Sequence, residues 1–322
     1  MSNFLNLSRM GNLTLREITK AILRCCPEWT IDSICYLADG DFCSAYVVND
    51  QWVFRFAKHD EARASLKREY CLLPKLVNQI TLPIPSPQIA SFEDNPKLSF
   101  IAYPLLPGHA LSQEQYFTLD EASRARCAEQ VAHFLNQMHS VDVRLAEDCH
   151  VLANEYANRC SDLLKQAQEN LFAILDKSEC LFIERVIGNY LESGNTSDFR
   201  FTLLHGDLSP DHVLFDEKAK QVTAIIDFGD IMIGDPAWDF LWIYEDYGLD
   251  FLSRVLPAYR ESDQPALLQR VFQFSLLQTI DWAISCQVKG DNAFMEAMTQ
   301  LRIMRVQEEA RFTELLLTCG FA

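Results

Sequence analysis

The sequence predicts an α+β fold of two lobes, a small β-rich lobe over residues 1–103 and a mostly helical lobe over residues 104–322. Two observations lead to this prediction. Apolar side chains alternate with a period of two in the β-rich runs of the first third, and after the breaker at residues 104–108 they recur with a period of 3.6. The chain has 322 residues, of which 49% are hydrophobic, so it is long enough to form two sizeable cores.

The first lobe begins with a helix and continues in short strands. Thr14 and Glu17 form a capping box that opens the helix. Strand patterns follow, and they are found at residues 34–37, 45–48, 52–56, 89–92 and 98–103. Between the third and fourth of them, residues 61–77 have a helical pattern, and Pro74 is expected to kink or end that helix near Leu73.

Two charged residues of this lobe interrupt apolar patterns. Alternation places Arg55 on the strand face opposite Trp52, Phe54 and Phe56. Glu69 lies on the same helical stripe as leucines, and a carboxylate placed inward normally has a partner. The alternative is that both are surface charges at the boundary of the core.

The second lobe is predicted to be helical except around its centre. Residues 120–140, 151–191 and 251–317 have helical patterns. In between, the apolar runs 213–215 and 222–226 flank a polar turn, which indicates an antiparallel hairpin. His212 enters this hairpin and Asp227 leaves it, so both should lie at one end of it, next to the loop that contains Asp207.

The residues at this end of the hairpin are the types that phosphoryl transfer needs. That reaction uses one carboxylate to orient a hydroxyl and accept its proton, and further ligands for the magnesium that neutralises the phosphates. Asp207 fits the first role, and Asp227 with His212 fits the second. The alternative is that these are ordinary turn residues, since Asp, Gly and Pro occur in the turns of any fold.

Several short motifs in this stretch occur in the order and spacing of a known family. They are His205-Gly-Asp207, the five-residue step to His212, Asp227-Phe-Gly-Asp230 and Gly234-Asp-Pro236. Together they resemble the aminoglycoside phosphotransferase family of kinase-like small-molecule kinases, and most closely its 2''-phosphotransferase branch. The resemblance implies a bilobal, protein-kinase-like fold.

The resemblance also implies where a nucleotide and a metal ion would bind. Arg55, which stands where the family often has lysine, would pair with Glu69 and hold the phosphates of ATP or GTP, with Mg²⁺ on Asp227 and His212. Further nucleotide contacts are expected from the loop after the first strand and from the hinge between the lobes, and the residues concerned are Gly40, Ser44, Tyr103 and Leu106.

The acceptor prediction rests on local charge. Residues 221–253 contain seven carboxylates and neither lysine nor arginine, which favours a cationic small-molecule substrate. By resemblance, Glu245 and Asp246 would bind an aminoglycoside, with Asp230 and Trp282 as further contacts. The alternative is an acidic helix face that is simply solvated.

These observations lead to one predicted function and two alternatives. The prediction is a phosphotransferase that moves the γ-phosphate of ATP or GTP to a hydroxyl of an aminoglycoside antibiotic and so gives resistance. The alternatives are a kinase of another small alcohol, such as a macrolide or an amino-alcohol metabolite, and a catalytically silent nucleotide-binding protein.

Composition excludes other classes of partner and location. The formal charge of −17 disfavours nucleic acid, and no apolar run approaches the length of a membrane span. The eleven cysteines are scattered, odd in number and never spaced as Cys-x-x-Cys. We therefore expect reduced thiols in a cytoplasmic protein.

Overall fold

The computed structural model describes residues 13–153, 156–193, 200–260 and 263–321. Contacts between residues divide the chain into two compact units. The first unit comprises Met1–Ser112, Val141–Val151 and Asp211–Ile231, and the second comprises Gln113–Ser140, Leu152–Pro210 and Met232–Ala322. No described helix is long and apolar enough to cross a membrane.

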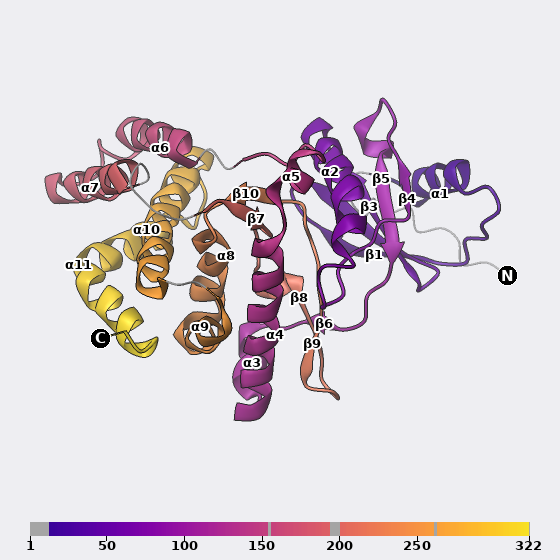
Figure 1. Ribbon diagram of the computed structural model, residues 1–322. Helices are drawn as coiled ribbons and strands as arrows, with labels where there is room; N and C mark the ends of the chain where they lie inside the picture. The colour runs from indigo at the N-terminus through magenta and orange to yellow at the C-terminus, as the bar shows by residue number, and fades with distance from the viewer. Residues whose placement is uncertain (1–12, 154–155, 194–199, 261–262, 322) are drawn as a thin grey trace. The chain divides into compact units, whose positions relative to one another are not determined.

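The first unit is built on a five-stranded antiparallel sheet in the order β1-β2-β3-β5-β4. Its strands are β1 (Ile34–Asp39), β2 (Cys43–Val48), β3 (Trp52–Ala57), β4 (Ile89–Ser91) and β5 (Phe100–Pro104). Helix α2 (Asp60–Leu76) packs against β3 and β5 (Figure 1). The sheet therefore holds the backbone of its central strand, β3, on both sides.

Helix α1 (Leu15–Cys25) and the aromatic face of the sheet form the main core of this unit. Thr14 and Glu17 make the predicted capping box. Ile18 and Ile22 of the helix are fully buried in one cluster with Phe54 and other side chains of the sheet. Apolar alternation in β3 thus points the aromatic residues into this core.

A second, three-stranded sheet in the order β6-β8-β9 also belongs to the first unit. The predicted hairpin is present as β8 (Val213–Asp216) and β9 (Gln221–Ile225), preceded by the 3₁₀ turn η2 (Pro210–His212). The short strand β6 (His109–Ala110) pairs with β8. This pairing explains why the hairpin groups with the N-terminal residues, although it lies far beyond residue 103 in the sequence.

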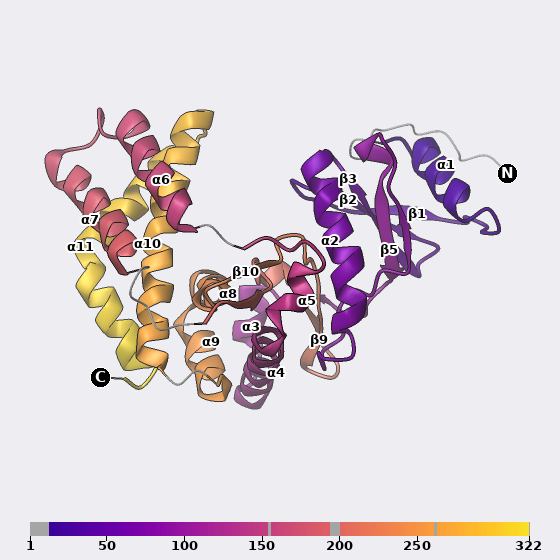
Figure 2. The same cartoon turned by 45° about the horizontal axis from the view of Figure 1, so that its top comes forward.

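The second unit is mainly helical, and its long C-terminal helices pack with α6 and α7 into a bundle (Figure 2). Its helices are α3 (Gln113–Thr118), α4 (Glu121–Ser140), α6 (Tyr156–Asn170), α7 (Lys177–Ser193), α8 (Ala237–Trp242), α9 (Gly248–Val255), α10 (Gln264–Lys289) and α11 (Phe294–Thr318). Its strands β7 (Thr202–Leu204) and β10 (Met232–Gly234) pair with each other. The π-helical turn η3 (Ile243–Tyr247) and the 3₁₀ turn η4 (Leu256–Ala258) flank α9.

The predicted elements are present, with two local differences. Helix α2 continues through Pro74 to Leu76, because a proline in the last turn removes only one hydrogen bond there. The predicted strand at 98–103 begins at Phe100, since Pro96–Leu98 form the 3₁₀ turn η1. Helix α5 (Val143–Glu147) follows α4 in the sequence, and its contacts group it with the first unit.

The prediction that all cysteines are reduced thiols is wrong for two of them. Cys71 of α2 and Cys149, just after α5, form a disulfide with a Cα–Cα distance of 5.5 Å. They are 78 positions apart, so no spacing motif announced the pair. The disulfide ties the segment around α5 to the C-terminal half of α2.

We expect this disulfide to stabilise the first unit. Closing a loop of 78 residues removes chain entropy from the unfolded state, so Cys149→Ser should lower the free energy of unfolding by up to ~4 kcal/mol in urea titrations without reductant. Cys35→Ser, at an exposed free cysteine, is the matched control. A non-reduced digest that lacks a cross-linked peptide containing Cys71 and Cys149 would contradict the expectation.

Candidate active site

Arg55 and Glu69 form a buried ion pair in the first unit. Arg55 lies in β3, opposite Ala45 and Ile101 of the neighbouring strands. Its Nη1 atom is 2.5 Å from Oε2 of Glu69, and the two residues are only 6% and 1% exposed. Charges taken out of water destabilise a fold unless they are paired. The structure therefore brings together the two residues that interrupt the apolar patterns of β3 and α2.

Arg55 binds a second carboxylate, that of Asp227. Nη2 of Arg55 is 2.7 Å from Oδ1 of Asp227, which also accepts a hydrogen bond from the backbone N–H of Gly229 at 3.3 Å. Asp227 has a φ of 60°, in the left-handed region that aspartate tolerates better than most residues. A Cβ on residue 229 would lie 3.2 Å from Asp227 Oδ1 and 3.4 Å from Arg55 Nη2, so glycine gives this turn the space it needs.

The pKa values of the buried pair follow from burial and from these contacts. Burial raises the pKa of Glu69 to about 7, and the Arg55 charge only partly opposes the rise. Burial alone would lower the pKa of Arg55, but Asp227 and Glu69 outweigh it and raise that pKa well above its usual range. Arg55 is therefore a fixed cation shared by two carboxyl groups.

Asp227 and His212 lie at the same end of the hairpin, as the sequence predicts. His212 Nε2 is 3.7 Å from Asp227 Oδ2, the oxygen on the side away from Arg55. The Asp227 side chain is 42% exposed, so a cation can reach it. Within the described residues no three His, Cys, Asp or Glu side chains gather as metal ligands. Mg²⁺ commonly takes one or two protein ligands and completes its shell with phosphates and water, which a site centred on Asp227 fits.

The predicted residue Gly40 lies in the loop between β1 and β2, and the predicted residue Ser44 lies at the start of β2. The Ser44 hydroxyl is buried and donates to Asp39 Oδ1 at 2.6 Å, while the N–H of Gly40 donates to Cys43 O at 3.0 Å. Lys58 closes the loop, with Nζ 2.9 Å from Asp39 Oδ2 and a hydrogen bond to the Gly40 carbonyl. The Ser44 hydroxyl is therefore used to shape the loop, whereas a Cβ at position 40 would meet only the carbonyl oxygen of Cys43, at 4.0 Å.

The predicted hinge follows β5. Tyr103 is 5% exposed and pairs with Val53 of β3, so its side chain belongs to the core. The N–H of Leu105 donates to Gln51 O at 2.7 Å and is already used. Leu106, half-buried just beyond, remains the predicted position for a main-chain contact to a purine.

Asp207 lies in the second unit, in the loop after β7. The buried carboxylate of Asp239 in α8 accepts hydrogen bonds from the backbone N–H groups of His205 and Gly206, at 2.9 and 2.8 Å. The indole of Trp238 donates to the Gly206 carbonyl at 2.9 Å. The loop is thus held on both sides of its main chain directly before Asp207, whose half-buried side chain follows.

His139, at the end of α4, completes the support of Asp239. Its Nε2 lies 3.0 Å from Asp239 Oδ2 and its Nδ1 lies 2.7 Å from the hydroxyl of Tyr259. Burial would raise the pKa of Asp239, but the hydrogen bond and charge of His139, the charge of His205 and the Gly206 N–H outweigh burial and lower it. Asp239 therefore holds the loop as an ionised carboxylate.

Glu245, Asp246 and Trp282 line one cavity of about 1060 Å³ in the second unit. The two carboxylates lie on the π-helical turn η3, and π turns are frequent at functional sites. Ser275 of α10 donates a hydrogen bond to Glu245. The fourth predicted acceptor residue, Asp230, is not in this cavity, because it lies three residues beyond Asp227 in the first unit and is exposed.

Sequence patterns missed two groups of residues around these sites. Lys58 is the first residue after β3. The only sequence signal for it was a positive charge next to a strand rich in aromatic residues. Asp281 and Glu296 add two further carboxylates to the acidic cavity. Asp281 directly precedes Trp282 in the sequence, and this position could have identified it as a further acceptor residue. Glu296 lies on another helix, and no sequence pattern indicated it.

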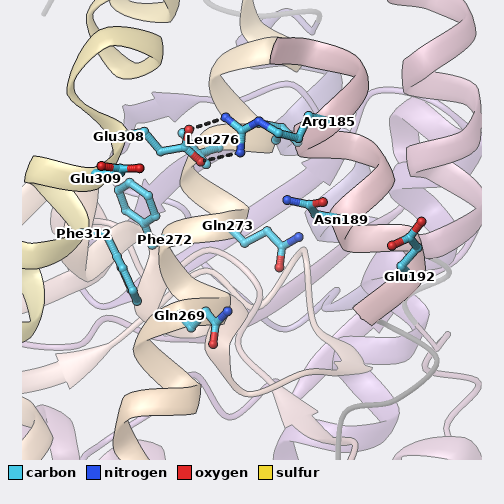
Figure 3. A pocket seen from close by; sticks show the side chains of 11 residues that line it. Arg185, Asn189, Glu192, Gln269, Phe272, Gln273, Leu276, Glu308, Glu309 and Phe312 are labelled. Carbon is cyan, nitrogen blue, oxygen red and sulfur yellow. Dashed lines mark hydrogen bonds and ion pairs between the residues drawn. The ribbon is translucent and has the colours of Figure 1, made fainter. Parts of the chain in front are cut away.

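The second unit also contains a cavity of about 810 Å³ among α7, α10 and α11 (Figure 3). Arg185 points across it to Glu308 and makes two hydrogen bonds with that carboxylate. The amide side chains of Asn189, Gln269 and Gln273 also line it. None of the residues predicted from the sequence lies among its described lining.

Comparison with known proteins agrees with this arrangement. Residues 39–272 match the model of the phosphotransferase enzyme family APH. The structure of the GDP and kanamycin complex of APH(2")-IIia is 28% identical, with a TM-score of 0.80 over 88% of this chain and 96% of that one. The GDP complex of wild-type aminoglycoside 2'-phosphotransferase-IIIa is 27% identical, with a TM-score of 0.81 over 90% and 98%.

A more distant structure, macrolide 2'-phosphotransferase type I, is 19% identical, with a TM-score of 0.67 over 91% and 99% of the two chains, and shows a likeness of fold alone. The predicted kinase-like fold and the resemblance to 2''-phosphotransferases are both confirmed.

The raised pKa of Glu69 leads to a prediction about stability. A carboxyl group whose pKa is higher in the folded than in the unfolded protein contributes stability below its unfolded value, and the contribution is lost as the pH rises through the folded value. Relative to Glu69→Gln, the metal-free wild type should therefore lose up to ~3 kcal/mol of unfolding free energy as the pH rises from 4.5 to about 7.

The measurement is a series of urea titrations across that pH range. Glu61→Gln, at an exposed position of the same helix, should show no such trend. A difference of the opposite slope would mean that the attraction of Arg55 outweighs the cost of burying Glu69.

Proposed function

Because this chain belongs to the APH phosphotransferase enzyme family, we propose that it transfers the γ-phosphate of ATP or GTP to a hydroxyl of an aminoglycoside antibiotic and so gives resistance. That it is a phosphotransferase follows from the family. The antibiotic as acceptor and the roles of single residues are the further steps of the proposal, and the next paragraphs give their support.

The acidic cavity of the second unit is the observation that carries the acceptor assignment. Four carboxylates line it, those of Glu245, Asp246, Asp281 and Glu296, and no lysine or arginine occurs among its described lining. Asp281 forms an ion pair with Arg159 at 2.8 Å, so part of its charge is already balanced. Like charges gathered in one cavity repel each other, and a ligand with several ammonium groups relieves that repulsion. Trp282, 37% exposed, offers a flat face for a sugar ring.

We assign the nucleotide to the first unit. Arg55 is held in place by Glu69 and Asp227, so its guanidinium presents a fixed charge to the phosphates. Lys58, beside the Gly40 loop, is a second cation for the same phosphates. Leu106 supplies main-chain groups for the purine, which is compatible with either ATP or GTP.

Mg²⁺ is assigned to Asp227, with His212 beside it. When bound, this ion neutralises charge on the phosphates during transfer. Oδ1 of Asp227 contacts Arg55, and Oδ2 lies 3.7 Å from Nε2 of His212, so we assign the metal to the Oδ2 side of the carboxylate. Oxygen is the ligand that magnesium prefers, so Asp227 dominates and His212 either binds a metal-bound water or ligates weakly.

Asp207 is the proposed base. Its carboxylate orients the acceptor hydroxyl and takes its proton, the hydroxyl oxygen forms a bond to the γ-phosphorus, and the bond to the β-phosphate oxygen breaks to release the nucleoside diphosphate. The hydrogen bonds from His205 and Gly206 to Asp239 fix the backbone on which Asp207 stands. A base positioned in this way loses little entropy on reaching its reactive geometry.

Asp207→Asn should keep folding and nucleotide binding and lower turnover by roughly two to four orders of magnitude, the usual contribution of a positioned base. Steady-state kinetics with a fluorescent nucleotide-binding assay separates the two effects. Asp211→Asn, at an exposed position four residues further on, is the matched control. A folded Asp207→Asn protein with most of its activity would remove the assignment.

The acceptor assignment is tested by neutralising the cavity. Glu245→Gln/Asp246→Asn should raise the KM for kanamycin- or gentamicin-like acceptors by about tenfold or more, because hydrogen bonds to charged groups are among the strongest. Nucleotide affinity should stay unchanged, and the salt dependence of KM should weaken. Asp162→Asn/Glu184→Gln, at exposed positions of α6 and α7, is the charge-matched control.

A panel of acceptors distinguishes the alternatives. Phosphorylation of macrolides or of singly charged amino alcohols, with no activity on any aminoglycoside, would replace the proposed acceptor by another small alcohol. Absence of turnover with every acceptor, with nucleotide still bound, would favour the silent nucleotide-binding protein.

A further inference from the structure

A third cavity of the second unit, of about 430 Å³, lies beside the support of the catalytic loop. The C-terminal half of α4, strand β7 and the segment after η4 surround it. It is separate from the acidic cavity, because the two share no lining residue. The charge of its lining side chains is also opposite to that of the acidic cavity.

Four basic side chains line this cavity, those of Arg200, Arg260, His133 and His139. The other ionisable group is the phenol of Tyr259, and neither Asp nor Glu occurs among the described lining. Such a gathering is unusual in a chain with 45 acidic and only 28 basic residues. Charges of one sign in a concave surface focus the electric field and attract a ligand of the opposite sign.

No described residue neutralises the two guanidinium groups. In the part of the chain that the structure describes, neither Arg200 nor Arg260 forms an ion pair or a side-chain hydrogen bond, and both residues are exposed. The arginine in the cavity of Figure 3 differs, because Glu308 binds both ends of the Arg185 guanidinium. Arg200 and Arg260 therefore keep their full donor capacity for a ligand.

The position of Arg260 is fixed by α4. Asn136 accepts a hydrogen bond from the backbone N–H of Arg260 at 2.8 Å and donates one to the carbonyl of Ala258 at 2.8 Å. The side of the cavity that carries Arg260 is thus built before a ligand arrives, which reduces the entropy lost on binding.

Thr202 gives a second, independent indication. It lies in β7, where Gly234 pairs with its backbone, and it is 9% exposed. Its hydroxyl oxygen is buried and has no hydrogen-bond partner among the described residues. A buried polar group without a partner destabilises the fold. Thr202 lines the cavity, so one of its lining residues has a hydroxyl that the described residues leave without a hydrogen bond.

We propose that this cavity is a binding site for a small phosphate-bearing anion. Arg200 and Arg260 supply forked donors, which match phosphate oxygens in pairs, and the volume suits a ligand of one or two phosphate groups rather than a macromolecule. His139 lines the same cavity and binds Asp239, which holds the backbone before Asp207. An anion in this site therefore lies one side chain away from the carboxylate that supports the catalytic loop.

Calorimetric titration with pyrophosphate tests the site. The wild-type protein is first saturated with a non-hydrolysable nucleoside triphosphate analogue, so that the phosphate subsites of the nucleotide are filled. One further site should be observed, with an affinity that falls as the salt concentration rises. Absence of that site at millimolar pyrophosphate overturns the proposal.

The variants identify where the anion binds. Arg200→Gln/Arg260→Gln should weaken pyrophosphate binding by about tenfold or more, since two charge-assisted contacts are lost. Arg16→Gln/Arg144→Gln removes two exposed arginines of the first unit and should leave the affinity unchanged. Equal affinities in the two double variants contradict the proposal.

Hydrogen exchange of the wild type gives a test that does not depend on how the variants fold. Pyrophosphate should slow exchange in peptides that cover residues 133–140 and 256–260. Slowing confined to other peptides overturns the assignment. Because nucleotide binding and turnover are not read out here, the result is independent of the proposed function.

Discussion

The sharing of Arg55 between Glu69 and Asp227 is the constraint on which the first unit depends. The guanidinium is buried, and each carboxylate takes a separate nitrogen, so the loss of either contact leaves the buried charge of Arg55 with a single carboxylate. The contacts join strand β3, helix α2 and the turn after β9. A hydrogen bond from Ser65 to the Gly229 carbonyl, at 2.7 Å, fastens α2 to the same turn a second time. The position of α2 and the left-handed conformation of Asp227 are therefore set together.

One of these two contacts was predicted and the other was not. A period of two in β3 and of 3.6 in α2 indicated Arg55 and Glu69 as charges that interrupt apolar patterns, and the resemblance to the family implied that they pair. Asp227 lies 172 positions from Arg55, and nothing in the chain near either residue links them. The disulfide between Cys71 and Cys149 was missed for the same reason, since only the tertiary fold brings these residues within 5.5 Å. Even β6, with two residues, is too short to have a period, so the grouping of the hairpin with the first unit was not predictable.

In the second unit, polar residues on otherwise apolar elements determine how the loop before Asp207 is held. Asp239 is fully buried in α8. A buried carboxylate destabilises a fold unless it accepts hydrogen bonds, and the two backbone N–H groups and His139 provide them. Asp239 follows the Gly234-Asp-Pro236 motif, and the resemblance to the family implies that it holds the neighbouring loops by hydrogen bonds. His139 belongs to a Met-His-Ser pattern that also occurs in the family, but the sequence favoured a core or capping role for it, because its partner lies 100 positions away.

The two cavities of opposite charge have a consequence for binding within one unit. An aminoglycoside-like cation is attracted by Glu245 and Asp246 and repelled by Arg200 and Arg260, whereas a phosphate-bearing anion experiences the reverse. Each site thus discriminates against the ligand of the other without any difference in shape. Asp239 lies six residues before Glu245 in the sequence, and it is bound to His139, which lines the basic cavity. Its carboxylate is fully buried, so a ligand in either site reaches it only indirectly, and the hydrogen bonds that Asp239 makes are one physical route that could couple the two sites.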